Sequence, residues 1–180
     1  MKQSNVKANV HAFKGAAALI TAAVLTAVLL FTGCSDGGSS STGNIEGVWK
    51  ALSATGVESG VTTTGNFPAP CEDDPDNSSN TDAKKQPYMC FYEGKMYPAS
   101  KYSGMSNSAK NGLFLQGQGA PYSLSGNAII VDGNSMGVVS FPSAGRLEFK
   151  TFESGNSATY LCEKTSDYTA EQIKAAPQEP

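Results

Sequence analysis

The chain has 180 residues, a length that fits one domain with flanking segments, and a formal net charge of −3. Asp and Glu outnumber Lys and Arg, 16 against 13, and Arg146 is the only arginine. This balance argues against a protein that binds the phosphate backbone of nucleic acids.

The N-terminal segment has the layout of an export signal. Residues 1–14 carry three lysines and no acidic residue, and residues 15–32 are apolar or small throughout. A positive region, an apolar run and then small residues are typical of a secretory signal. The alternative is a permanent transmembrane helix, because roughly 18 apolar residues nearly span a bilayer.

The residues Phe31-Thr32-Gly33-Cys34 favour the signal, because they resemble the lipobox of bacterial lipoproteins, with Phe31 in place of the usual leucine. The resemblance implies cleavage between Gly33 and Cys34, a diacylglycerol thioether on Cys34 and acylation of the new amino group. We therefore expect a signal peptide at 1–33, a membrane anchor through this covalent lipid, and no other cofactor. Residues 34–44, rich in Gly and Ser, are expected to form a flexible tether.

The residue after the lipidated cysteine bears on localisation in the cell envelope. In enteric-type sorting an aspartate at this position retains a lipoprotein in the inner membrane. Here Ser35 follows Cys34, and Asp36 comes one position later. We therefore expect the outer membrane rather than the inner one.

Cleavage at this point would also change the chemistry of the mature chain. Residues 1–33 contain the only histidine, His11, and three lysines, so the remainder has ten basic and 16 acidic residues and a net charge of −6. Without histidine the mature protein has no Ser-His-Asp or Cys-His catalysis and no histidine metal site. We expect no catalytic residues, no metal and no enzymatic activity.

From residue 45 the pattern changes to short runs of β-forming residues separated by turn residues such as Glu93-Gly94 and Asp132-Gly133-Asn134. Turns of this chemistry between consecutive strands favour hairpins and antiparallel neighbours. Because closure removes unpaired edges, we expect an up-and-down antiparallel barrel of about eight strands over 45–165. The expected strands lie at 46–54, 87–92, 95–101, 112–117, 121–124, 127–132, 136–141, 146–152 and 157–164.

Two segments differ from this pattern. Residues 55–86 are long and polar, and we expect a surface loop over one end of the barrel, with a short strand at 60–65. In the last part, 166–180, Thr169 and Gln172 have the spacing of a capping box. This predicts a short helix near 169–176 and a loose end that contains proline.

The first strand carries Gly47-Val48-Trp49. A Gly-x-Trp motif here, followed by a meander and a late helix, resembles lipocalin-type (calycin) barrels. The resemblance implies that Trp49 plugs one barrel end and that a basic residue near the last strand packs across it. Lys164 is the expected equivalent, with Arg146 as the alternative; an ordinary core tryptophan in an unrelated β-sandwich is the competing interpretation.

Three cysteines remain after Cys34, which implies one pair and one spare in an exported domain. If the first and last strands are neighbours, Cys90 and Cys162 flank the first strand at about 9–10 Å, beyond disulfide reach. A bridge from Cys71 to either of them is easier, and we favour Cys71–Cys90. The acidic residues of 72–76 are interpreted as a solvated loop rather than a Ca²⁺ site.

The leading hypothesis is a lipid-anchored lipocalin-like barrel that binds a small apolar ligand or serves as an envelope surface protein. The alternative is a protein-interaction module, an adhesin or a hydrolase inhibitor, with a barrel filled by side chains. An eight-stranded barrel is wide enough for either interior. The sequence identifies no protein partner.

Overall fold

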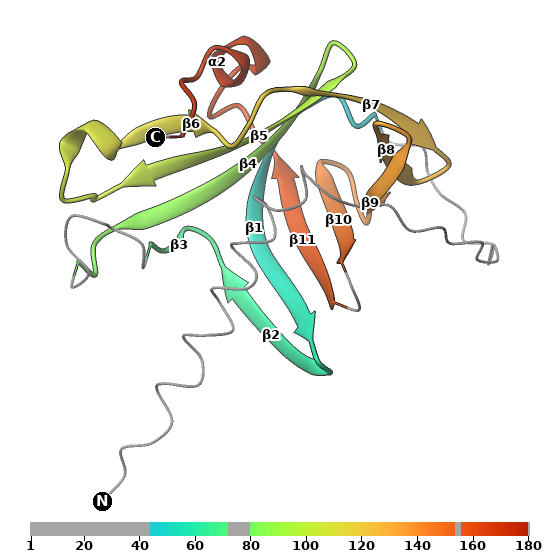
Figure 1. Cartoon of the computed structure of the whole chain (residues 1–180), viewed down its shortest axis with the longest axis horizontal. Coiled ribbons are helices and arrows are strands. Elements are labelled where there is room, and N and C mark those ends of the chain that lie inside the picture. Colours follow the sequence, from blue (N-terminus) through green and yellow to red (C-terminus); the bar gives the residue numbers. More distant parts are fainter. Residues whose placement is uncertain (1–43, 72–79, 154–155, 180) are drawn as a thin grey trace, which may run out of the picture.

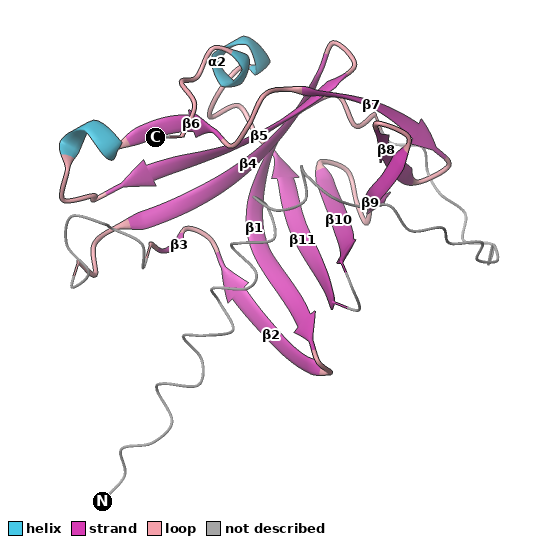
Figure 2. Cartoon of the chain, in the orientation of Figure 1, coloured by secondary structure: helices cyan, strands magenta, loops and turns pink. Residues whose placement is uncertain are grey.

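The structure is a computed structural model that describes residues 44–71, 80–153 and 156–179. These ranges form an all-β domain with two short helical segments (Figures 1 and 2). The strands are β1 (Gly47–Glu58), β2 (Val61–Asn66), β3 (Ala69–Pro70), β4 (Lys84–Tyr92), β5 (Lys95–Ser103), β6 (Gly112–Leu115), β7 (Ala120–Ser125), β8 (Ala128–Val131), β9 (Asn134–Ser140), β10 (Arg146–Glu153) and β11 (Asn156–Lys164). The helical segments are η1 (Ser108–Lys110) and α2 (Ala170–Lys174).

Eight of these strands close into a ring. The order is β1-β4-β5-β7-β8-β9-β10-β11, every pairing is antiparallel, and β11 pairs back onto β1. Strands β2, β3 and β6 lie outside the ring on the edges of β1, β4 and β5. The prediction of an up-and-down antiparallel barrel of about eight strands with a short C-terminal helix is confirmed.

Tight turns set the register of three hairpins. Ser59-Gly60, Glu93-Gly94 and Asp132-Gly133 have φ values between 50° and 80° at both positions. The residues that flank each pair are direct register partners. This is the two-residue hairpin geometry whose twist matches that of the strands, and glycine at the second position takes the positive φ without strain.

The hydrophobic core fills the inside of the ring. On β10, Leu147 and Phe149 face inward and are 0% and 4% exposed. Lys150, the next residue, is exposed to solvent. Inward and outward side chains therefore alternate along this strand. One dry face and one wet face are what the wall of a small barrel requires.

The segment 55–86 is more ordered than expected. β1 continues to Glu58, β2 forms the hairpin expected near 60–65, β3 adds a short pairing, and β4 begins at Lys84. The prediction of one long loop was wrong at these positions because threonine is polar but favours strands. Thr55 and Thr64, for example, face each other across β1 and β2 with hydroxyl oxygens 2.9 Å apart.

Helix α2 packs on the outer face of β4 and β5, where Ile173 is completely buried (Figure 1). The predicted capping box is confirmed, because Thr169 and Gln172 exchange both hydrogen bonds. The C-terminal end is not loose as far as residue 179. Leu115 donates its N–H to the carbonyl of Pro177 and accepts from Glu179, so this tail pairs with β6.

Candidate functional site

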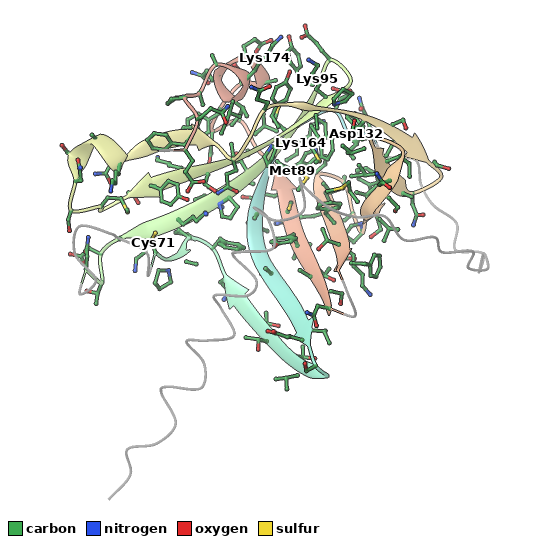
Figure 3. All side chains as sticks on the ribbon, in the orientation of Figure 1. Cys71, Met89, Lys95, Asp132, Lys164 and Lys174 are labelled. Carbon is green, nitrogen blue, oxygen red and sulfur yellow. The ribbon has the colours of Figure 1, made fainter. Side chains whose placement is uncertain are left out.

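At one end of the ring, Gly47, Trp49 and Lys164 come together. Trp49 is 2% exposed, and its indole N–H donates to the Ile45 carbonyl at 2.7 Å. Lys164, labelled in Figure 3, is the register partner of Trp49. Its Nζ lies 5.5 Å from the centre of the Trp49 indole. A Cβ on Gly47 would stand 2.9 Å from Cε of Lys164, so glycine leaves room for the lysine stem. The alternative, Arg146, instead pairs with Glu163 at 3.4 Å.

Beyond Trp49, side chains occupy the barrel interior. A single contact cluster of buried residues includes Phe91, Ile129, Leu147 and Phe149 from three different strands. An eight-stranded barrel is just wide enough for its side chains to meet across the axis. This part of the interior is therefore a packed core.

The pairing between β1 and β4 is short. Their pairing covers only Gly47 to Lys50 on β1, and from Ser53 onward β1 pairs with β2 instead. Pro87 has no N–H to continue the β4 ladder. In place of a backbone N–H, the Gln86 side-chain amide donates to the Ala51 carbonyl at 2.7 Å.

Met89 lies beside this separation. It is the register partner of Trp49 on β4 and packs against the core cluster, so it belongs to the inner face. Nevertheless it is only partly buried. The inner wall is therefore reachable by solvent at Met89.

The inner wall continues from β5 onto β6 and the C-terminal tail, and it becomes polar. Tyr102 on β5 hydrogen bonds through its hydroxyl to the Glu179 carboxylate, and the Gln116 amide donates to the other oxygen of Glu179 at 3.1 Å. Two buried atoms of this wall, Oγ of Ser100 and Oε1 of Gln116, have no hydrogen-bond partner. Each buried polar group without a partner costs about 1–3 kcal/mol, so this wall differs from an ordinary core.

On the outer surface, tyrosines of the barrel hold carboxylates of the flanking segments. Tyr88 donates to Asp167 at 3.1 Å, and Lys50 pairs with the same carboxylate at 2.9 Å. The hydrogen bond from Lys50 and those from Thr165 and Tyr88 hold the pKa of Asp167 below its usual range. Burial, followed by the bond to Asp167, raises the pKa of Tyr88.

The same arrangement recurs twice. Tyr92 donates to Glu171 at 2.8 Å, which lowers the pKa of Glu171 and raises that of Tyr92 to about 12. Tyr122 donates to Glu46 at 3.0 Å, and burial, together with this bond, raises the pKa of Tyr122 to about 12. These contacts attach both flanks of the domain to the barrel.

The expected disulfide between Cys71 and Cys90 is not formed, and Cys90 is a buried thiol whose pKa burial raises to about 12. Cys71 donates its N–H to the carbonyl of Ala83. Ala83 precedes Cys90 by seven residues, which corresponds to about 23 Å along an extended strand. Cys90 and Cys162 do flank β1 on β4 and β11, as the closed ring predicted. Cys90 packs beneath α2 and Cys162 inside the ring, on opposite faces of the wall.

The predicted lipid attachment at Cys34, the cleavage at Gly33 and the acidic residues of 72–76 lie outside the described residues. Within the described ranges no group of three His, Cys, Asp or Glu side chains is placed to hold a metal ion. No helix in these ranges is long and apolar enough to cross a membrane.

The fold and site define a closed eight-stranded antiparallel barrel with a Trp–Lys end and a partly polar inner wall. Comparison of the chain with family models, with curated proteins and with solved structures gives no match.

Proposed function

We propose that this chain is a lipid-anchored lipoprotein of the cell envelope whose domain is a lipocalin-like barrel that binds a small apolar ligand. The fold supports the second half of this proposal. A closed up-and-down ring whose first strand carries Gly47 and Trp49, with Lys164 over the tryptophan, is similar to a lipocalin barrel in arrangement as well as in motif.

The observation that carries the ligand-binding function is the exposure of Met89. Its side chain faces inward, where an apolar group is expected to be fully buried, yet it retains contact with solvent beside the separation of β1 and β4. An apolar molecule that entered here would bury Met89 and contact the core cluster. Burial of apolar area is the main source of affinity for such ligands.

Extraction with organic solvent tests this function. We expect the full chain, purified from membranes, to release a small apolar compound in near-stoichiometric amount, detected by mass spectrometry. A Met89→Asp variant that folds should release much less of it, and the matched variant Met136→Asp, on β9, tests general damage to the barrel. An empty extract from the folded wild-type chain would remove the ligand-binding function.

The anchor rests on Phe31 to Cys34 and on the apolar run before them. Several acyl chains, each CH₂ contributing about 0.8 kcal/mol, would hold the domain firmly to a bilayer, and Ser35 after the cysteine favours the outer membrane. Metabolic labelling with a radioactive fatty acid tests it. We expect label in the wild-type chain and none in Cys34→Ala, and label that persists in the variant would contradict the anchor.

A protein-interaction module is the second candidate, and the packed core favours it. β2 gives it a binding surface, because one edge of this uncharged strand has no partner among the described strands. Unprotected edges of this kind pair with strands of other proteins. Both candidates are non-catalytic, in keeping with the loss of the only histidine with the signal.

A further inference from the structure

Two polar side chains on the inner wall are buried beyond nine-tenths and incompletely satisfied. Ser100, on β5, is 0% exposed, and Gln116, directly after β6, is 6% exposed. Oγ of Ser100 and Oε1 of Gln116 have no hydrogen-bond partner, although buried polar groups nearly always have one. A ligand that supplies partners to both atoms would explain their presence.

The two side chains share one face and are close neighbours. Ser100 pairs with Phe114, and the Gln116 N–H donates to Pro98 at 2.9 Å, so Gln116 and Ser100 stand diagonally across β5 and β6. Such diagonal neighbours lie about 7–8 Å apart at Cα, and somewhat less at the side chains. At this separation, a small polar group placed between the two side chains would be within hydrogen-bond reach of both.

On the side away from Glu179, the neighbours of this pair are apolar. Ser100 also pairs with Pro87, and Pro98 pairs with the partly buried Met89. The face therefore leads from Met89, where solvent reaches the wall, to the two polar atoms on the same side of the sheet. An elongated molecule would place an apolar body along this path and a polar end at Ser100 and Gln116.

The polar end is restricted by charge and by donor count. Oε1 of Gln116 only accepts, so the ligand must donate, and Ser100 can donate or accept. The Gln116 amide already holds the Glu179 carboxylate at 3.1 Å, and a second carboxylate beside it would be repelled. Burial away from water also disfavours a charged group that has no partner of opposite charge. A hydroxyl can donate to Oε1 of Gln116, carries no negative charge beside Glu179, and is neutral when buried.

We propose that Ser100 and Gln116 bind the hydroxyl head of a neutral, single-chain amphiphile, with its apolar chain directed toward Met89. The inference rests on the ligand-binding function above and adds the head group of the ligand. It places the head outside the packed ring, on the wall that β6 and the C-terminal tail add to β5.

Native mass spectrometry of the full chain released from detergent micelles tests the proposal, with 1-decanol and decanoate as matched probes. The wild-type chain should carry one 1-decanol adduct and far less decanoate. In the double variant Ser100→Ala, Gln116→Met the 1-decanol adduct should fall roughly tenfold, as the loss of one or two neutral hydrogen bonds implies. The variant Gln118→Met, at an exposed neighbour, should bind like the wild type.

The outcomes separate the two proposals. Equal 1-decanol binding by the wild-type chain and the double variant, or equal binding of decanoate and 1-decanol by the wild type, overturns the head-group assignment and leaves the ligand-binding function standing. A wild-type chain that binds neither probe counts against both. If the double variant does not fold, Ser100→Ala alone, which leaves the Gln116–Glu179 bond intact, is compared in the same way.

Discussion

At the scale of the residue, Lys164 links the first and last strands of the ring through Trp49. Its ammonium is exposed and lies 5.5 Å from the ring centre, so the interaction is of the weaker, hydrated kind. We expect Lys164→Met to lower the free energy of unfolding by about 0.5–1 kcal/mol in urea denaturation. Lys95→Met, at another exposed strand lysine, serves as control, and equal stability of the two variants would contradict the contact.

A second residue-scale prediction concerns Gln86. Its amide supplies the hydrogen bond that Pro87 cannot give to the Ala51 carbonyl. Gln86→Ala leaves this acceptor without its partner, and we expect a loss of about 1–3 kcal/mol in the free energy of unfolding. Chemical denaturation measures it against Gln118→Ala, an exposed glutamine. A change no larger than that of the control would show that Gln86 does not replace the ladder.

At the scale of the element, α2 is attached by a buried side chain. Ile173 is 0% exposed beneath the helix and contacts the outer face of β4 and β5. Ile173→Ala removes three carbon atoms from this cluster and should destabilise the domain by about 2–5 kcal/mol. Thermal unfolding followed by circular dichroism measures the loss, and Ile130→Ala, at a partly buried position on β8, should cost less.

The segment before α2 is also attached by charge. The pKa of Asp167 is lowered in the folded state, so its contribution to stability is complete above its ordinary pKa of 3.8 and is lost as pH falls further. Glu171, with an ordinary pKa of 4.5, acts in the same direction. We therefore expect the melting temperature to fall below pH 4.5, and less steeply in Asp167→Asn. Asp132→Asn, in the β8–β9 turn, should keep the wild-type slope.

The sequence reveals most elements because their signals are local. Turn pairs such as Glu93-Gly94 fix hairpins within a few residues, and the alternation around Phe149 identifies the inward face without knowledge of any partner strand. β3 and the pairing of the tail with β6 carry no such signal, because two or three residues contact a strand far away in the chain. The prediction of a Cys71–Cys90 disulfide failed for the same reason. The distance between the two cysteines depends on the register of β3 on β4, which has no local signal in the sequence.

At the scale of the whole molecule, closure of the ring was predictable, whereas its exact membership was not. Nine strand segments suggested eight or nine ring members, and only the pairings show that β6 lies outside, beside the tail. The inner-wall site depends on that arrangement. Ser100 and Gln116 are 16 positions apart, and the register of β6 alone places them together.

The mass of the protein isolated from membranes under native conditions tests both the lipid anchor and the bound apolar ligand in one experiment. We predict a chain that begins at Cys34, carries the mass of a diacylglycerol and an acyl group, and holds one further non-covalent molecule that is lost on unfolding. A chain that retains residues 1–33, or an unmodified Cys34 without any bound molecule, would rule out a lipid-anchored, ligand-binding barrel.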